Sequence, residues 1–442
     1  MELAKRLDKI VEEKWQKQWA EANLFSFNES DTSRPIYSID TPPPFTSGEF
    51  HMGHILSYSY FDFVARYKRM TGFNVYYPQG WDCQGFPTEV KVEKKYGRKP
   101  PEEFRKLCIA WTVEFIEKMK KQMQRMGFSP DWKYEYRTMS PQYHKTVQLS
   151  ALKMHEKNQL YLGAHPVFWC THCHSALAKT DTDDVERNTQ LYDIKFELKL
   201  EDGTATPLTI ATTRPELMHA CVAVLFHPTD ERYNKLKNAK AITAFGKEVP
   251  FLADNDVDKE FGTGAVMVCT FGDKQDVIWM YRHKLPYIKS MDEFGKLENA
   301  GEFSGLKVKE AKEKIIEKYK KEGKLLSSKQ ISQTVKVHDR CTKPIELVNS
   351  HQWFAKITEK KDEIISTAKN MKWIPEFAIA HLIDWANYIE WDWVVSRQRI
   401  FGTPIPFWHC KKCNKIISPS QEELPVNPPA IKKKCPDCNE NA

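Results

Sequence analysis

Two histidines, His51 and His54, stand where a β-prone run gives way to a helical pattern. The run covers residues 35–40, a loop with three consecutive prolines follows it, and the helical pattern begins at Ile55. A helix N-terminus presents unpaired N–H groups and the positive end of the helix dipole, so it binds phosphate readily. Histidines there can donate hydrogen bonds to phosphoryl oxygens, and Gly53 lets a flat base or ribose approach the backbone. An isolated His-x-x-His is more often a surface pair, so this interpretation depends on its context.

An acid near the end of a later β-prone run is the second candidate. Asp82 lies in a glycine-containing loop, residues 80–85, that follows the run at 74–77. Ligands of open α/β sheets bind at the carboxyl ends of the strands, and an acid there can hold an ammonium group. A solvated aspartate in a turn explains the sequence equally well.

Cysteine is frequent, and its spacing favours metal ligation over disulfides. The chain has eleven cysteines, and two Cys-x-x-Cys pairs near its end are separated by 21 residues, which is close to zinc-ribbon spacing. Four thiolates leave no open coordination position, so we predict a structural Zn²⁺ site. Its ligands are Cys410, Cys413, Cys435 and Cys438.

A second set of four possible metal ligands is split between distant parts of the sequence. A Cys-x-x-Cys and a His-x-x-Cys bracket a long segment, and together they would form a closed tetrahedral zinc site that clamps both connections of an inserted domain. The predicted ligands are Cys170, Cys173, His338 and Cys341. The alternatives are free cysteines in one or both pairs, or His172 or His174 as the fourth ligand.

The segment between these pairs is β-prone, and two of its turns carry polar groups. Strands are predicted near 191–200, 206–212 and 220–226, and a basic helix near 307–324. The run 211–217 reads Ala-Thr-Thr-Arg-Pro-Glu-Leu, whose hydroxyls and guanidinium suit a ribose or phosphate. The run 260–276 contains a glycine-rich turn, a strand and two acids three residues apart, Asp273 and Asp276, which suit an ammonium ligand. Ordinary turn residues explain each run alone.

Length and composition limit the classes of protein. The 442 residues are too many for one hydrophobic core and predict about two to four domains. Lys plus Arg exceed Asp plus Glu by 66 − 59 = 7, which suits a nucleic-acid partner without requiring one. No apolar run approaches the roughly eighteen residues of a membrane span. The charged N-terminus predicts an amphipathic helix and not a signal peptide. We therefore predict a cytoplasmic location and no membrane partner.

The surroundings of the histidine pair resemble the first signature of the class I aminoacyl-tRNA synthetases. Residues 41–54 read Thr-Pro-Pro-Pro-Phe-Thr-Ser-Gly-Glu-Phe-His-Met-Gly-His, and the triple proline with His-Met-Gly-His resembles the valyl branch. The resemblance implies a Rossmann-like catalytic domain in which His51 and His54 are catalytic and bind ATP together with Gly53. The two histidines would stabilise charge on the α-phosphate. It also implies that Asp82 binds the substrate amino group, near Pro43, Pro44 and Trp81.

The two polar turns resemble the editing domain of the valyl, isoleucyl and leucyl enzymes. The resemblance implies that Thr212, Thr213 and Arg214 contact the 3′ end of tRNA. Asp276 would bind the ammonium group of a misattached amino acid, and Asp273 belongs to the same set. Such a domain is needed because a pocket shaped for valine cannot strongly reject threonine, which has the same shape. Met267 and Cys269 resemble the archaeal form of this domain.

The return to the catalytic domain and the order of domains follow from the same resemblance. Residues 385–408 resemble the Ser-Arg-Gln stretch of this subgroup, and no second ATP-binding signature follows them. We predict an α/β fold: a Rossmann-like class I synthetase catalytic domain interrupted by a β-rich editing domain, with zinc-ribbon knuckles. The predicted parts are 1–160, 161–347, 348–408 and 409–442, with a missing C-terminal half as a possible partner.

The predicted function is ATP-dependent attachment of valine to tRNA(Val) through valyl-adenylate, with hydrolysis of threonyl-tRNA(Val). ATP and Mg²⁺ are the predicted cosubstrate and metal, structural Zn²⁺ fills two sites, and valine and tRNA(Val) are the partners. Three alternatives remain open at this point. They are an isoleucyl-type synthetase, a freestanding tRNA-proofreading hydrolase, and a non-catalytic tRNA- or partner-binding protein.

Overall fold

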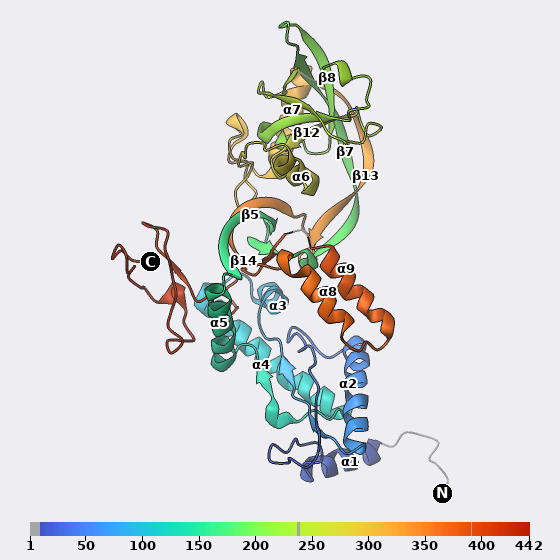
Figure 1. The fold of residues 1–442 in the computed structure, drawn as a ribbon, viewed down its shortest axis with the longest axis vertical. Helices are drawn as coiled ribbons and strands as arrows, with labels where there is room; N and C mark the ends of the chain where they lie inside the picture. Colours follow the sequence, from blue (N-terminus) through green and yellow to red (C-terminus); the bar gives the residue numbers. More distant parts are fainter. Residues whose placement is uncertain (1–8, 237–238, 390) are drawn as a thin grey trace. The chain divides into compact units, whose positions relative to one another are not determined.

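The computed structural model describes residues 9–236, 239–389 and 391–442 (Figure 1). The chain divides into two compact units, one of Met1–Asn158 with Arg399–Ala442 and one of Gln159–Gln398. The predicted N-terminal helix is described from residue 9 onward, and its first eight residues lie outside the described part. None of the described helices is long and apolar enough to cross a membrane.

The first unit is an α/β layer of short parallel strands and longer helices. Its strands are β1 (Ile36–Ser38), β2 (Asn74–Tyr76), β3 (Gly80–Trp81) and β4 (Tyr136–Arg137). Its helices are α1 (Lys9–Glu21), α2 (Met52–Met70), α3 (Phe86–Tyr96), α4 (Pro101–Arg125) and α5 (Pro141–Glu156). β1 pairs in parallel with β2, and β3 pairs in parallel with β4. Parallel neighbours need crossover connections, and α2 supplies the one between β1 and β2.

Backbone hydrogen bonds continue the strand pairing beyond these short strands. Ile39 donates to the carbonyl of Tyr76 at 2.9 Å, and Thr46 donates to the carbonyl of Asp82 at 3.1 Å. On the other side, Thr138 donates to the carbonyl of Trp81 at 3.1 Å. Segments 36–46, 74–82 and 136–138 therefore lie side by side, with 74–82 in the middle.

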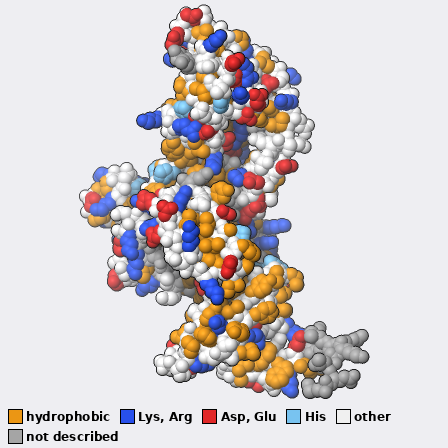
Figure 2. Space-filling view, turned by 45° about the vertical axis from the view of Figure 1, so that its right-hand side comes forward, with side chains coloured by type: hydrophobic (Ala, Val, Ile, Leu, Met, Phe, Trp, Pro, Cys, Tyr) orange, Lys and Arg blue, Asp and Glu red, His pale blue; other side chains and the backbone are white. Residues whose placement is uncertain are grey.

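Helix α2 is amphipathic, but its outer face is not fully polar. The buried side of the unit includes Phe50, Tyr58, Trp81 and residues of α4 in one core cluster. A row of α2 side chains stays exposed, and Figure 2 shows hydrophobic side chains on the surface of the molecule. The row consists of Met52, Leu56, Tyr60, Phe63, Tyr67 and Met70.

A buried ion pair fixes the segment that re-enters the first unit. The side chain of Glu89, in α3, is 1% exposed and pairs with Arg399. Oε1 of Glu89 also accepts a hydrogen bond from the backbone N–H of Phe401 at 2.6 Å, and Gly85 donates to the carbonyl of Phe401 at 2.9 Å. Burial lowers the pKa of Arg399 to about 10, so its guanidinium stays charged at neutral pH. The charge on each partner is therefore compensated inside the unit.

The second unit is built on a seven-stranded sheet. Six strands run in the order β12-β9-β11-β10-β7-β13, and β8 pairs with β7. The strands are β7 (Thr182–Lys199), β8 (Ala205–Thr212), β9 (Cys221–Phe226), β10 (Lys240–Ile242), β11 (Glu248–Ala253), β12 (Ala265–Cys269) and β13 (Leu325–His338). Helices α6 (Lys274–Arg282) and α7 (Val308–Lys321) accompany the sheet. All six residues of β9 are buried, as expected for a strand covered on both faces.

A four-stranded sheet and two further helices complete the second unit. The strand order is β15-β14-β5-β6, with β5 (Leu160–Cys170), β6 (Ser175–Leu177), β14 (Glu346–Ala355) and β15 (Trp393–Val394). The helices are α8 (Lys361–Lys369) and α9 (Ile379–Asn387). β7 and β13 form a long antiparallel ribbon that runs from Ile194 opposite Leu325 to Thr182 opposite His338.

Short elements connect the rest. β16 (Trp408–His409) and β17 (Ile416–Ile417) form a two-stranded antiparallel pair in the first unit. The 3-10 helices are η1 (Trp132–Tyr134), η2 (Lys179–Asp181), η3 (Pro215–Ala220), η4 (Asn234–Leu236), η5 (Gly301–Phe303), η6 (Thr358–Lys360), η7 (Glu376–Ala378) and η8 (Pro428–Ala430). The predicted α/β class with a β-rich region is confirmed, and the predicted strands and basic helix between 191 and 324 are all present.

Removing the charge of the buried Glu89 should lower the free energy of unfolding far more than removing the charge of an exposed glutamate of the same helix, α3. Glu89→Gln keeps an acceptor for the backbone of Phe401 but leaves Arg399 buried without its counter-charge, so we expect unfolding free energy to fall by about 3–5 kcal/mol. Glu93→Gln is the matched control. Glu93 lies in the same helix as Glu89 and forms an exposed ion pair with Arg98, so its substitution should cost at most about 1 kcal/mol. Urea unfolding followed by tryptophan fluorescence measures both, and equal losses would contradict the prediction.

Candidate functional site

The histidine pair caps the N-terminus of α2. His51 is the N-cap residue, and its Nδ1 accepts a hydrogen bond from the backbone N–H of Gly53 at 3.1 Å. The backbone N–H of His51 donates to Nδ1 of His54 at 3.3 Å. The two rings stack with centroids 3.9 Å apart, and Phe50 stacks on the other face of this pair against His54. Both imidazoles are thus held in place before any ligand binds.

These contacts fix the tautomer of both rings. Since Nδ1 accepts a backbone N–H in each case, a neutral ring carries its proton on Nε2. Burial, followed by the charge of His51, lowers the pKa of His54 and favours this neutral form. A side-chain carbon on residue 53 would lie 3.1 Å from Cε1 of His51, so glycine leaves room for the ring. The helix start therefore offers two Nε2–H donors at the positive end of the helix dipole, which suits a phosphate.

The loop before the histidines lies beside the loop that contains Asp82. Phe45 and Asp82 form a parallel bridge, and Asp82 donates its backbone N–H to the carbonyl of Pro44 at 3.0 Å. Burial raises the pKa of the Asp82 carboxyl, although the backbone N–H of Gln84 and the hydroxyl of Thr138 oppose the shift. A desolvated carboxylate gains most from a cationic ligand, so this position suits an ammonium group.

The remaining residues predicted for the amino-acid pocket differ in exposure. Pro43 is partly exposed and Pro44 is buried next to the Asp82 backbone. Trp81 is fully buried, and its side chain packs in the core cluster with Phe50 and Tyr58. A role for these three residues in binding an amino acid stays a prediction.

In the second unit, the polar run after β8 is held by an ion-pair network. The hydroxyl of Thr212 accepts the backbone N–H of Arg214 at 2.9 Å. The guanidinium of Arg214 donates to Glu216 and to Glu346, each at 2.8 Å. Burial by itself lowers the pKa of Arg214, but the charges of Glu346 and Glu216 outweigh it and hold the pKa above its ordinary value. Arg214 is therefore a permanent cation whose side chain is 30% exposed.

Lys312 and Glu346 belong to this network and carry no local motif. Nζ of Lys312, in α7, donates to the carbonyl of Thr213 at 2.7 Å and lies over the ring of Tyr192. Burial lowers the pKa of Lys312 and raises the pKa of Glu346. Both residues come from elements about 100 or more positions away, as the separations of 99 and 132 residues show. Sequence reasoning gave no signal for either.

The acidic pair occupies the N-terminus of α6. Oδ1 of Asp273 accepts the backbone N–H of Asp276 at 2.9 Å, which makes Asp273 an N-cap residue. Asp276 is buried, and its Oδ2 accepts the backbone N–H of Cys269 at 3.3 Å. Burial, followed by the charge of Asp273, raises the pKa of Asp276 well above its ordinary value. An ammonium ligand would restore the ionised form of this carboxylate.

The structure brings the acidic pair and the polar run together. A side-chain carbon on Gly272 would meet Oδ2 of Asp276 and would lie 3.4 Å from Cδ1 of Leu217, so the two turns are in close contact. The positive charge of Arg214 lowers the pKa of Asp276 in opposition to burial. Met267 and Cys269 are buried in the hydrophobic core cluster of the second unit, which also contains Leu217. One region thus combines a fixed cation, a buried acid and two threonines.

The first cysteine cluster converges as predicted, in the second unit. Sγ of Cys170 and Sγ of Cys341 are 3.6 Å apart, and Nδ1 of His338 lies 3.5 Å from Sγ of Cys173. A tetrahedral zinc with Zn–S bonds of about 2.3 Å places its sulfur ligands roughly 3.8 Å apart. The four ligand atoms lie within 4.8 Å of one another, and His172 and His174 are not in the described cluster. The hydrogen bond with Cys173 lowers the pKa of the Cys170 thiol to about 3, which favours the thiolate.

The second cluster lies in the first unit, beside β16 and β17. Its sulfur pairs Cys410–Cys438, Cys413–Cys435 and Cys413–Cys438 are 3.4, 3.5 and 3.7 Å apart. The backbone N–H of Cys413 lowers the pKa of Cys410 to about 6. No cysteine of the chain is in a disulfide, so all four thiols are free to ligate a metal. Both clusters have the donor set and spacing of closed zinc sites.

Comparisons with known proteins agree on one family. The family model described as tRNA synthetases class I (I, L, M and V) matches residues 14–432. The valine--tRNA ligase of Methanocaldococcus jannaschii is 48% identical over 444 aligned residues, which cover 99% of this chain and 50% of that protein. The enzyme of the same description from Pyrococcus furiosus is 49% identical, covering 97% of this chain and 49% of its own length. The chain thus spans about half the length of the curated relatives that it matches.

A solved structure is similar at lower identity. The ternary complex of Agrobacterium radiobacter K84 LeuRS with tRNA and LeuAMS matches with a TM-score of 0.46 and 19% sequence identity. The match covers 98% of this chain and 56% of that chain.

The two clusters predict how the thiols respond to chelation. Seven of the eleven cysteines belong to the clusters, and the other four, Cys83, Cys108, Cys221 and Cys269, are buried. We expect about two Zn²⁺ per chain, and chelation should expose seven thiols to a thiol reagent before the four buried ones react. Elemental analysis and thiol titration measure this. Cys438→Ser should lose one zinc while Cys108→Ser keeps both, and seven reactive thiols in untreated protein would contradict the prediction.

Proposed function

The chain belongs to the class I tRNA synthetases of the I, L, M and V group, and from this premise we propose that it takes part in attaching valine to tRNA(Val). The observation that carries the proposal is the identity of 48–49% to valine--tRNA ligases over almost the whole chain. The reaction has two steps. The valine carboxylate attacks the α-phosphorus of ATP and releases pyrophosphate, and the 3′-terminal ribose of tRNA then attacks the carbonyl of valyl-adenylate and releases AMP.

We propose that the helix start of α2 acts on the α-phosphate in the first step. The Nε2–H groups of His51 and His54 would donate to the oxygens on which negative charge develops, and they need no reorganisation because their rings are already fixed. The adjacent carboxylate of Asp82 would hold the ammonium group of valine. Mg²⁺ would accompany the ATP phosphates, as it commonly does in such reactions.

We propose that residues 161–347 form the editing domain. The buried carboxylate of Asp276 would bind the ammonium group of a mischarged threonine, and Arg214 with its neighbouring threonines would contact the tRNA 3′ end. A neutral carboxylic acid cannot hold an ammonium ion, so substrate binding and ionisation of Asp276 must occur together. The two cysteine clusters would each hold a structural Zn²⁺, which also agrees with a cytoplasm that keeps thiols reduced.

The editing proposal predicts a specific pattern of deacylation by this chain. Threonyl-tRNA(Val) should be hydrolysed and valyl-tRNA(Val) should be spared, and Asp276→Asn should lower the first rate by about 10²-fold or more, because the ammonium contact is lost. Asp258→Asn is the matched control, since Asp258 is an exposed acid in the same unit. Release of labelled amino acid measures the rates. Hydrolysis of valine from isoleucine tRNA would instead favour an isoleucyl-type enzyme.

The activation proposal predicts the effect of one histidine. His54→Asn keeps an acceptor for the backbone N–H of His51 but removes the Nε2 donor, so valine-dependent exchange of pyrophosphate into ATP should fall by about 10²–10³-fold. The assay uses this chain joined to the remaining region of its relatives. His351→Ala, an exposed histidine of β14, should leave the exchange unchanged. Unchanged exchange in His54→Asn would contradict the proposed role of His54, whereas a wild-type protein that deacylates tRNA without any exchange would favour a proofreading hydrolase.

A further inference from the structure

His338 differs from the other residues of the two clusters because its ring has two nitrogens with different surroundings. Nδ1 lies 3.5 Å from Sγ of Cys173 and 3.2 Å from Sγ of Cys341, so this nitrogen is the one that a metal in the cluster would take. An imidazole that binds a metal through Nδ1 carries its proton on Nε2. The ring then presents an N–H donor on the side away from the sulfur atoms.

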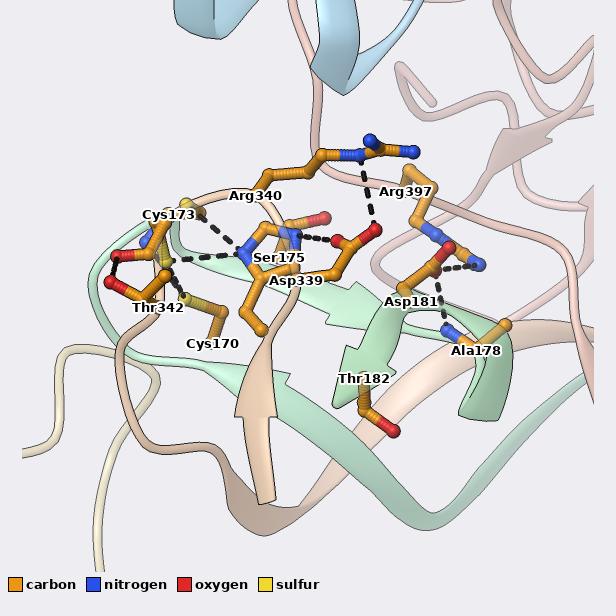
Figure 3. A network of polar contacts seen from close by, with 12 residues as sticks. Cys170, Cys173, Ser175, Ala178, Asp181, Thr182, Asp339, Arg340, Thr342 and Arg397 are labelled. Atoms are coloured by element: carbon orange, nitrogen blue, oxygen red, sulfur yellow. Dashed lines mark hydrogen bonds and ion pairs between the residues drawn. The ribbon is translucent and has the colours of Figure 1, made fainter. Parts of the chain in front are cut away.

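The carboxylate of Asp339 faces this donor, beside Arg340 (Figure 3). Oδ1 of Asp339 lies 3.6 Å from Nε2 of His338, and it is buried without a hydrogen-bond partner among the described residues. The His338 side chain is 0% exposed, so bulk water does not reach the ring. A shift of about 0.7 Å closes the gap to an ordinary N–H···O distance of about 2.9 Å. The carboxylate is therefore placed to accept a hydrogen bond from this buried N–H.

Asp339 is itself held from two sides. Its backbone N–H donates to the carbonyl of Asp181 at 3.0 Å, and its Oδ2 lies 3.2 Å from Nε of Arg340. The carboxylate of Asp181 in turn accepts from the backbone of Ala178 at 2.8 Å and from Arg397 at 3.0 Å. The acceptor is thus anchored through η2, which directly precedes β7, and its position does not depend on one flexible side chain.

We propose that Asp339 is a positioning residue for the first metal cluster: its carboxylate accepts the Nε2 proton of His338 and holds Nδ1 toward the three sulfur atoms. This inference rests on the zinc site of the proposed function. Three thiolates and Zn²⁺ sum to one negative charge, so a nearby carboxylate needs the hydrogen bond and the cation of Arg340 to offset repulsion. Loss of such an acceptor typically weakens metal binding about 10–100-fold.

The test measures zinc affinity in the whole chain by competition with a chelator. Asp339→Ala should weaken zinc binding at the first cluster by about 10–100-fold, whereas the four-cysteine cluster in the same molecule should keep its affinity and act as an internal reference. Asp339→Asn keeps an acceptor oxygen and should lose less than Asp339→Ala. Asp183→Ala is the matched control, because Asp183 is an exposed acid opposite Val337 in the same ribbon and removes the same charge.

Thermal unfolding of metal-free and zinc-loaded protein separates positioning from a purely structural role. If Asp339 acts on the metal ligand, the metal-free forms of wild type and Asp339→Ala unfold at similar temperatures, and the increase on adding zinc is smaller in the variant. An equal loss in both forms with unchanged zinc affinity would overturn the inference, and so would an equal loss of affinity in Asp183→Ala. Wild-type protein that binds zinc at the four-cysteine cluster alone would overturn the first zinc site and this inference together.

Discussion

Glu89 accepts a hydrogen bond from the backbone of Phe401, which lies 312 positions later in the chain, and it pairs with Arg399 in the same buried place. Two ions in the interior are stable only while they compensate one another, so neither can be moved without a large cost. The first unit therefore fixes where the chain returns to it. The second compact unit, residues 159–398, lies in the sequence between the two parts of the first unit, and the chain re-enters the first unit at Arg399. Because α3 begins directly after the Asp82 loop, the return segment and the proposed ammonium site share one support.

The two proposed reaction sites use opposite electrostatic devices. At the start of α2, two histidines, fixed through Nδ1, present Nε2 donors where a phosphate would gain negative charge. Near the start of α6, the buried carboxylate of Asp276 has a raised pKa and would be stabilised by a cationic ligand. It lies close to Arg214, which two glutamates hold in place. Both arrangements are set by backbone contacts at helix N-termini.

Local spacing made part of this organisation predictable from the sequence. The histidine pair and the Cys-x-x-Cys pairs are short patterns whose chemistry follows from residues three positions apart, and the structure brings each set together. The sequence predicts His338 as the fourth ligand but leaves His172 and His174 open, because the place of His338 in the cluster depends on the pairing of β7 with β13. Glu346, Lys312 and the Glu89–Arg399 pair escaped prediction for the same reason. The partners of these buried charges are far away in the sequence, so no local sequence pattern identifies them.

The long ribbon of β7 and β13 needs something to fix the register in which its two strands pair. Residues 183–190 and 326–334 are largely exposed, so both faces of the ribbon meet solvent and burial does not distinguish one alignment of the strands from a slipped one. The alignment has to be imposed from the ends. At one end His338 lies opposite Thr182, and its ring must reach the thiols of Cys170 and Cys173 at the same time. A slip by one residue would turn the ring to the opposite face, away from the thiols. The four converging ligand atoms at this end, together with the buried Leu191 and Ile194 at the other end, therefore favour a single register for the ribbon.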